Sequence, residues 1–150
     1  MLKLRKNKKG FTLVELIVVI AIMAVLAGTI AGVTVTQLNK QTDNANKTQA
    51  KKVADTIYAE LMENPDIVAD KSDDEPTGDS MEEALTEAYG TAITWGVQGT
   101  SGGKIGITYD STSKTYSVTY VGKQSGTKGS VTYTVTAADG VKPGEAISNE

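Results

Sequence analysis

Residues 16–35 read LIVVIAIMAVLAGTIAGVTV, twenty residues without a formal charge. As an α-helix rising about 1.5 Å per residue, this stretch is about 30 Å long, which matches the hydrocarbon core of a bilayer. It is apolar on every side, which suits a helix surrounded by lipid or by other apolar helices. It is also longer than the apolar region of an ordinary secretory signal, about 7 to 15 residues. We therefore expect it to anchor the chain rather than to be removed.

A basic segment and one carboxylate precede the apolar stretch. Five of the first ten residues are Lys or Arg, and Glu15 is the only formal charge between Phe11 and Leu38. Basic residues directly before a span keep that end in the cytoplasm. A charge at membrane depth costs on the order of a few kcal/mol on insertion scales, so such a residue is a functional candidate by default.

The run Gly10-Phe11-Thr12-Leu13-Val14-Glu15 behind its basic leader resembles the class III signal of type IV pilins and pseudopilins. The resemblance implies that a prepilin peptidase cuts between Gly10 and Phe11 and methylates the new N-terminal Phe11. It also implies that Glu15 pairs with the Phe11 amine of a neighbouring subunit, and a buried charge does need such a partner. The alternative is that Glu15 only interacts with the dipole of its own helix.

Gly28 and Gly32 lie in the second half of the apolar stretch and form a small-xxx-small pair. Such a pair lets membrane helices approach one another closely. The resemblance offers a second interpretation, because many pilins have proline near this position, where the helix loosens in the filament. Both close packing and helix loosening are therefore expectations for these two glycines.

The next segment, residues 39–49, contains only one apolar residue, Ala45, and is predicted to be a solvated stalk or a polar filament seam. After it, apolar residues recur at helical spacing and mark one buried face. They are Ala50, Val53, Ala54, Ile57, Tyr58, Leu61 and Met62. Asn64-Pro65 ends the pattern, because the residue before proline is disfavoured in helical geometry. We expect one helix over residues 12–63, with its second half packed on a globular domain.

Residues 66–79 form a predicted acidic loop, in which Asp70, Asp73, Asp74 and Glu75 lie close together. Some pseudopilins bind calcium, but this loop lacks the ligand order of an EF-hand. We interpret it as a solvated loop and expect no metal and no cofactor. Ser80 and Glu83 then form a capping box for a short helix over residues 81–89.

Apolar residues alternate with Thr, Ser and Gly in the last third of the chain, as in half-buried antiparallel strands. The four sets are Ile93, Trp95 and Val97; Ile105, Ile107 and Tyr109; Tyr116, Val118 and Tyr120; and Val131, Tyr133 and Val135. The predicted fold class is α+β: a long N-terminal helix packed against a C-terminal antiparallel sheet of three or four strands, which is also the pilin architecture. The tyrosines are interpreted as core-edge residues. An aromatic surface for sugars, nucleic acid or electron transfer is the alternative.

Composition narrows the function. The 150 residues include no Cys and no His, so disulfides are impossible and the commonest catalytic side chains are missing. We therefore expect no enzyme; an exported hydrolase would need a nucleophile and a base that the sequence does not reveal. Residues 11–150 contain 10 basic and 18 acidic side chains. With no basic cluster in the sequence, no direct nucleic-acid binding by the isolated domain is expected.

These observations predict a structural subunit of a type IV pilus-like filament, a homo-oligomer assembled by an ATPase and a platform protein, as the resemblance implies. It would be stored in the cytoplasmic membrane with its N-terminus inside and end in an extracellular or envelope filament. The expected parts are a leader (1–10), a membrane and filament-core helix (11–38), an amphipathic continuation (39–64) and a globular domain (65–150). The alternatives are a pseudopilin of a type II secretion or DNA-uptake system, and a non-polymerising, single-span surface protein that binds a ligand.

Overall fold

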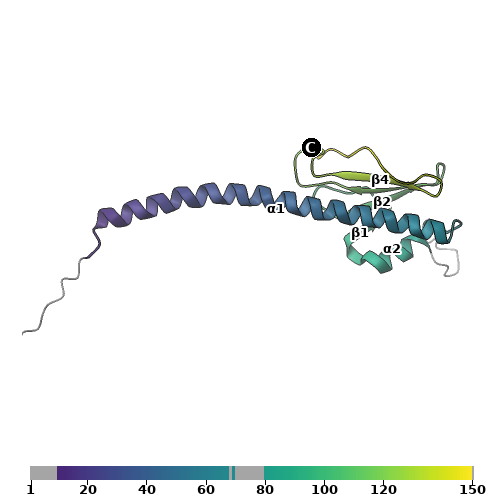
Figure 1. The fold of residues 1–150 in the computed structure, drawn as a ribbon, viewed down its shortest axis with the longest axis horizontal. Coiled ribbons are helices and arrows are strands. Elements are labelled where there is room, and N and C mark those ends of the chain that lie inside the picture. Colours follow the sequence, from purple (N-terminus) through teal and green to yellow (C-terminus); the bar gives the residue numbers. More distant parts are fainter. Residues whose placement is uncertain (1–9, 68, 70–79, 150) are drawn as a thin grey trace, which may run out of the picture. The chain divides into compact units, whose positions relative to one another are not determined.

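Helix α1 occupies Leu13–Glu63 and is the longest element of the protein (Figure 1). The computed structural model describes residues 10–67, 69 and 80–149. The helix matches the predicted range of 12–63 and continues without a break through Gly28 and Gly32. Its last backbone bond, from the Asn64 N–H to the Glu60 oxygen at 2.8 Å, is followed by Pro65, as the sequence predicts.

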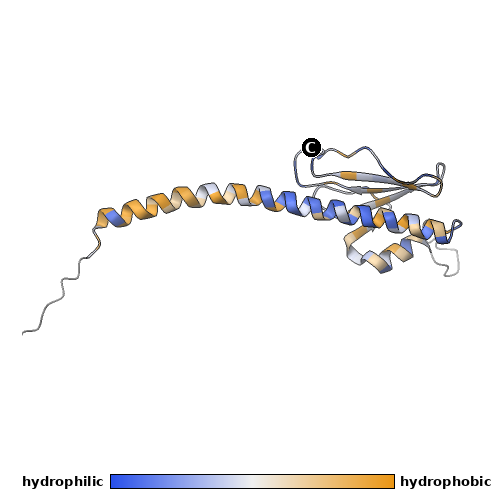
Figure 2. Cartoon of the chain, in the orientation of Figure 1, coloured by the Kyte–Doolittle hydropathy of each residue, from blue (hydrophilic) through white to orange (hydrophobic). Residues whose placement is uncertain are grey.

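The chain divides into two compact units, Met1–Gln37 and Leu38–Glu150. In unit 1, every described side chain is exposed. Figure 2 shows that apolar residues predominate in the first part of α1 and that polar residues take over further along the helix. The most apolar 18-residue window of α1 has a mean hydropathy of 2.8, so by length and composition α1 can cross a membrane. The apolar exposure of unit 1 calls for lipid or a partner protein.

Unit 2 contains a five-stranded sheet in the order β1-β2-β3-β4-β5. The strands are β1 (Ile93–Trp95), β2 (Ile105–Asp110), β3 (Thr115–Tyr120), β4 (Val131–Thr136) and β5 (Gly140–Pro143). Neighbours from β2 to β5 pair antiparallel, whereas β1 pairs parallel to β2. The α+β class is confirmed, with five strands rather than three or four and with one parallel pair.

The two differences have local causes. Strand β5 has only four residues and includes Gly140 and Pro143, which are weak strand signals. Strand β1 ends at Trp95, before the predicted Val97, because residues 97–99 turn back across the sheet. A Cβ added at Gly106 would collide with the backbone of residues 97–99. The glycine thus permits the close approach of that connection.

The core of unit 2 forms where α1 crosses the apolar face of the sheet. The predicted stripe on α1 is buried at Val53, Ile57 and Leu61. The other large buried side chains of the core come from the short helix α2 (Met81–Tyr89) and from the sheet: Met81, Leu85, Ile93, Ile105, Ile107, Tyr116, Val118, Tyr120 and Val135. The expected partnership between the helix stripe and the alternating strand residues is therefore confirmed.

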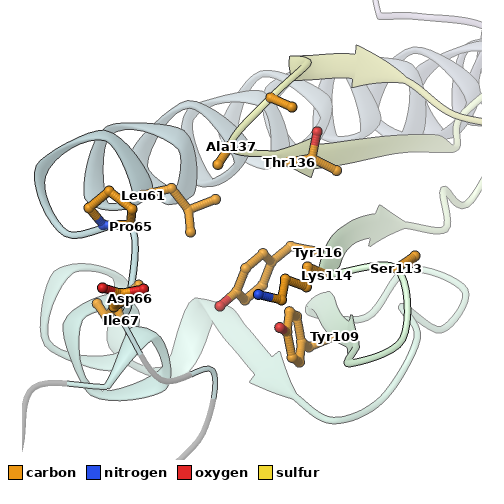
Figure 3. A pocket seen from close by; sticks show the side chains of 11 residues that line it. Leu61, Pro65, Asp66, Ile67, Tyr109, Ser113, Lys114, Tyr116, Thr136 and Ala137 are labelled. Carbon is orange, nitrogen blue, oxygen red and sulfur yellow. The ribbon is translucent and has the colours of Figure 1, made fainter.

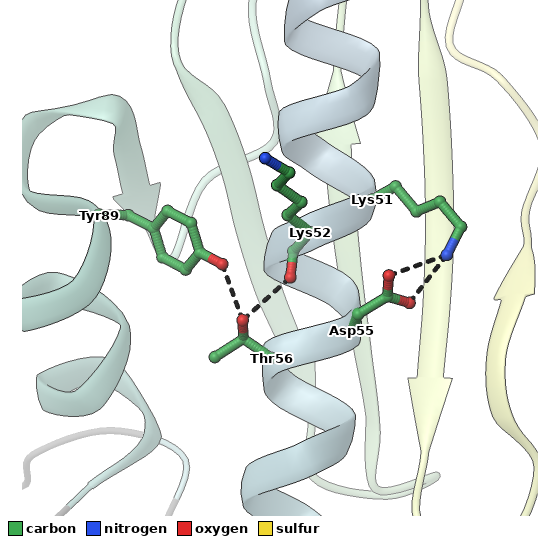
Figure 4. A network of polar contacts seen from close by, with 5 residues as sticks. All are labelled: Lys51, Lys52, Asp55, Thr56 and Tyr89. Carbon is green, nitrogen blue, oxygen red and sulfur yellow. Dashed lines mark hydrogen bonds and ion pairs between the residues drawn. The ribbon is translucent and has the colours of Figure 1, made fainter.

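Helix α2 begins where the capping box predicts, since the Ser80 hydroxyl accepts the Glu83 N–H at 3.2 Å. A short 3₁₀ helix, η1 (Gly90–Ala92), connects it to β1. Figure 4 shows how α2 is joined to α1: Thr56 Oγ1 lies 2.7 Å from the Tyr89 hydroxyl and also donates to the Lys52 carbonyl.

Candidate functional site

The first turn of α1 is organised by Thr12 and Glu15. Glu15 Oε2 accepts the Thr12 N–H at 2.8 Å and the Thr12 hydroxyl at 2.9 Å, and the Glu15 N–H points back to Thr12 Oγ1 at 3.3 Å. This is a reciprocal capping box, in which two residues three apart satisfy donors that the helix itself leaves unpaired. The Thr-x-x-Glu spacing was readable in the sequence, but sequence reasoning assigned Glu15 only to intermolecular pairing or to the dipole.

Phe11 lies just outside this turn, and its side chain is 89% exposed. Gly10, at the predicted cleavage junction, is also exposed and precedes the helix. The structure thus leaves residues 10 and 11 outside regular structure, directly before a capped helix. Such backbone is accessible to a peptidase because no helical hydrogen bond must be broken first.

Comparison with known families identifies a motif at the N-terminal end of the chain. Residues 5–31 match the prokaryotic N-terminal methylation motif. The chain carries the class III signal of type IV pilins and pseudopilins. The match to this class III signal includes Gly10, Phe11, Glu15 and Gly28. Searches of curated proteins and of solved structures find no match.

Gly28 and Gly32 lie on the exposed surface of α1, with no atom near the position where a Cβ would stand. Close approach of another helix is therefore sterically open at both. Nearby threonines bond back to the helix: Thr36 Oγ1 donates to the Gly32 carbonyl at 3.2 Å, and Thr34 Oγ1 to the Ile30 carbonyl at 2.8 Å. Such bonds slightly weaken and bend helices. Close packing and loosening at Gly32 both stay predictions.

A second carboxylate, Asp43, is completely buried although it lies in the segment predicted to be a solvated stalk. Its Oδ1 accepts the Tyr120 hydroxyl at 3.0 Å and the Lys123 N–H at 2.9 Å. Its Oδ2 accepts the Gln124 N–H and the Gln124 side-chain amide, both at 3.1 Å. We call these four residues the Asp43 site. The stalk expectation is wrong at this position, because a distant loop covers one face of the segment.

Burial raises the pKa of Asp43, but the hydrogen bonds from Lys123, Gln124 and Tyr120 outweigh it, so the pKa falls below its usual value of 3.8. Burial also raises the pKa of Tyr120; a hydrogen bond from Asn46 lowers it and the nearby Asp43 raises it further. Tyr120 therefore remains a neutral donor to an ionised carboxylate. Two backbone N–H groups, a hydroxyl and a side-chain amide stabilise this charge, and among the described residues no basic side chain pairs with it.

The loop of residues 121–130 is shaped to fit over Asp43. A Cβ at Gly129 would collide with Asp43 Oδ2, so only glycine leaves room for the carboxylate. The C-terminal segment extends the arrangement: Asn149 pairs with Gly126 through two backbone bonds of 3.1 Å and donates its side-chain amide to the Gly122 oxygen at 2.7 Å. This chain has no cysteine, and the hydrogen bonds of Asn149 fasten the C-terminal segment to the 121–130 loop without a disulfide.

The same loop contains two lysines, Lys123 and Lys128, that lie close to α1. Lys47 Nζ donates to the Lys128 carbonyl at 2.6 Å, and the Lys123 backbone binds Asp43. Lys40 lies three residues before Asp43 on α1 and therefore on the same helix face. We call Lys40, Lys47, Lys123 and Lys128 the lysine cluster. The sequence has no run of basic residues in this part of the chain, and these four lysines come together only because residues about 80 positions apart meet here.

The tyrosines support the core-edge interpretation. Tyr116 and Tyr120 are buried, and the Tyr109 and Tyr116 ring centroids lie 4.6 Å apart. Figure 3 shows these two rings beside a pocket of about 340 Å³, with Lys114 drawn between them and Leu61 and Asp66 on the opposite side. Asp66 and Ile67 lead into residues outside the described part, and we assign no ligand to this pocket.

Residues 70–79, which contain the acidic loop considered for calcium, lie outside the described residues. Within residues 10–67, 69 and 80–149, no group of three or more acidic side chains is placed to hold a metal ion.

Proposed function

We propose that this chain is the structural subunit of a type IV pilus-like filament. Its class III signal supports membership of the pilin or pseudopilin class, whose proteins are structural rather than enzymatic. In this proposal residues 1–10 are removed, residues 11–38 cross the membrane and later form the filament core, and unit 2 faces outward. The observation that carries the proposal is an apolar helix, exposed on all sides, with one carboxylate in its first turn, Glu15, at the fifth residue after the proposed cleavage junction.

The proposed assembly step joins Glu15 of one subunit to the Phe11 amine of the next. In the precursor, Glu15 caps its own helix through Thr12. Cleavage creates a positive amine at Phe11, which supplies the countercharge that a carboxylate needs in an apolar filament core. Capping and pairing are compatible, because Glu15 can accept more than the two bonds that it makes with Thr12.

Three substitutions separate pairing from capping. Glu15→Gln retains a capping-box residue but removes the charge, Glu15→Ala removes both, and Thr12→Ala weakens the cap but keeps the charge. We expect both Glu15 variants to be processed yet absent from sheared filaments, whereas Thr12→Ala should still assemble. Immunoblots of sheared and cell fractions, with electron microscopy, would measure this. Wild-type assembly of Glu15→Gln would refute the pairing step.

Intact-mass spectrometry of the exported protein tests processing on its own. The expected mass is that of residues 11–150 plus one methyl group. Recovery of surface protein that retains residues 1–10 would contradict the proposal. Asp66→Ala, which removes an exposed acid in unit 2, is the matched control and should change neither processing nor assembly.

The second candidate is a pseudopilin of a secretion or DNA-uptake system, which the same signal supports. Protein found in long surface filaments at native expression favours the pilus, and loss of export or of transformation on deletion favours the alternative. A processed, surface-exposed protein that stays monomeric would instead indicate a single-span binding protein.

A further inference from the structure

The lysine cluster is preorganised by the Asp43 site. Asp43 draws the backbone of residues 123 and 124 onto α1, beside the helix segment that contains Lys40 and Lys47, and the Lys123 side chain extends over Gly102. The lysine ammonium groups themselves are not used in these bonds, except that Lys47 reaches the Lys128 carbonyl. Asp43 is buried and Lys40, Lys123 and Lys128 are exposed, so the surface here is positive.

The two ends of unit 2 differ in charge. At the end where Leu61 and Tyr116 line the pocket, the exposed charged residues of α1 and of the nearby turns are mainly acidic. They are Glu63, Asp66, Asp110 and Asp139, against Lys114 and Lys142, the latter paired with Asp139 at 2.9 Å. At the end where Tyr120 meets Asp43, the lysine cluster faces solvent, and among the described residues of the adjoining C-terminal segment the exposed acid is Glu145. In a chain with 18 acidic and 10 basic side chains beyond residue 10, this positive end is a distinct surface.

Chain length places the positive end next to the membrane. Lys40 follows Val35, the last residue of the candidate span 16–35, by five positions. Even a fully extended chain spans at most about 3.6 Å per residue, so Lys40 stays within about 18 Å of the end of that stretch. This upper limit on the distance from Lys40 to the end of the stretch holds for every orientation of unit 2. A salt-screened attraction acts over about 10 Å at 0.1 M ionic strength.

We propose that the lysine cluster docks unit 2 onto anionic lipid headgroups of the membrane that holds residues 16–35. The proposal rests on the membrane storage that is part of the proposed function. Each lysine near an anionic surface adds a modest attraction, and several together produce stable docking. Lipid is favoured over nucleic acid or a second copy of the chain because the cluster directly follows the candidate span. Docking would hold the stored subunit against the bilayer, and filament assembly would release it.

The absence of cysteine gives a direct test. Ser125→Cys adds a single labelling site on the exposed loop that carries Lys123 and Lys128, and Ala138→Cys adds one at the opposite end. The processed full chain, with a fluorophore at either site, is placed in vesicles of phosphatidylcholine alone or mixed with phosphatidylglycerol, with a headgroup-labelled acceptor lipid. Energy transfer then reports the distance from the loop to the lipid surface.

We expect transfer from position 125 to be higher in the vesicles that contain phosphatidylglycerol, and to fall to the phosphatidylcholine level near 1 M salt, where the screening length is about 3 Å. Adding Lys123→Gln and Lys128→Gln should reduce the ratio of docked to undocked domains about thirtyfold. These two changes preserve the backbone N–H and carbonyl that contact Asp43 and Lys47. The matched pair Lys114→Gln and Lys142→Gln removes equal charge elsewhere and should have no effect.

Equal transfer in the two lipid mixtures, or an equal response to the two pairs of substitutions, would overturn the proposal. Transfer that follows protein density instead of lipid charge would assign the cluster to contact between copies and would also overturn it. Co-flotation of every variant with both kinds of vesicle reports anchoring by residues 16–35 independently. Loss of co-flotation would therefore contradict membrane storage itself, whereas intact co-flotation without lipid-dependent transfer would contradict docking alone.

Discussion

Glu15 and Asp43 are two carboxylates on one helix, and their surroundings show how differently the two units are built. Glu15 is exposed and bonds only within its own first turn, to Thr12 three residues away. Asp43 is fully buried and accepts four hydrogen bonds from residues 77 to 81 positions further along the chain. Unit 1 thus needs a partner for its apolar surface, whereas unit 2 buries an apolar core of its own and, among its described residues, leaves only Thr132 Oγ1 as a buried side-chain polar atom without a hydrogen bond.

The largest effect on unit 2 alone is expected in its apolar core. Ile57→Ala removes a completely buried side chain and should lower the free energy of unfolding by about 3 to 4 kcal/mol. Ile20→Ala, at a residue that is 57% exposed in unit 1, should leave the unfolding of unit 2 unchanged. Denaturant titration in micelles can follow Trp95, the single tryptophan, which lies 6.2 Å from the Tyr116 ring. Equal effects of the two substitutions would mean that the units do not differ as described.

Asp43→Ala should lower the free energy of unfolding of unit 2 nearly as much, by about 3 kcal/mol, because it leaves buried donors without an acceptor. The Tyr120 hydroxyl, two backbone N–H groups and the Gln124 amide all lose their partner. Asp55→Ala, at an exposed residue paired with Lys51 on the same helix (Figure 4), is the matched control and should change stability little. A small effect of Asp43→Ala would show that water or another group replaces the carboxylate without loss.

Gly129→Ala should destabilise unit 2 by about 1 to 3 kcal/mol, because the new Cβ would collide with Asp43 Oδ2. The cost should shrink in an Asp43→Ala background, where the opposing carboxylate is gone. Denaturant midpoints of the two single variants and of the double variant give this coupling directly. Strictly additive effects would indicate that the loop does not rest on Asp43.

The smallest expected effect is on acid stability. The pKa of Asp43 in the folded protein lies below the usual 3.8, so the unfolded chain binds this proton more readily. The stabilisation is therefore fully present above pH 3.8 and is lost as the pH falls through the folded-state value. Asp43→Asn should make the free energy of unfolding depend less on pH in that range. The exposed Asp110, whose pKa is lowered by hydrogen bonds from Ser113 and Thr112, should still contribute in both proteins.

The sequence by itself determined the features that depend on near neighbours. The uncharged stretch at residues 16–35, the stop at Pro65, the cap at Ser80 and the alternation in β2, β3 and β4 are all local patterns. Each is set by residues within a few positions, so periodicity and capping rules suffice to predict it. The class III signal is local in the same sense, since it lies within residues 5–31.

Features that depend on contacts between segments distant in the chain were decided only by the tertiary structure. The burial of Asp43 and the lysine cluster arise from segments about 80 positions apart in the chain. A sequence pattern reports whether a residue is polar, but not whether a distant loop will supply its hydrogen-bond donors. Asp43 looked like a stalk residue because its four donors come from residues 120–124, and only the packing of the sheet against α1 brings them within bonding distance.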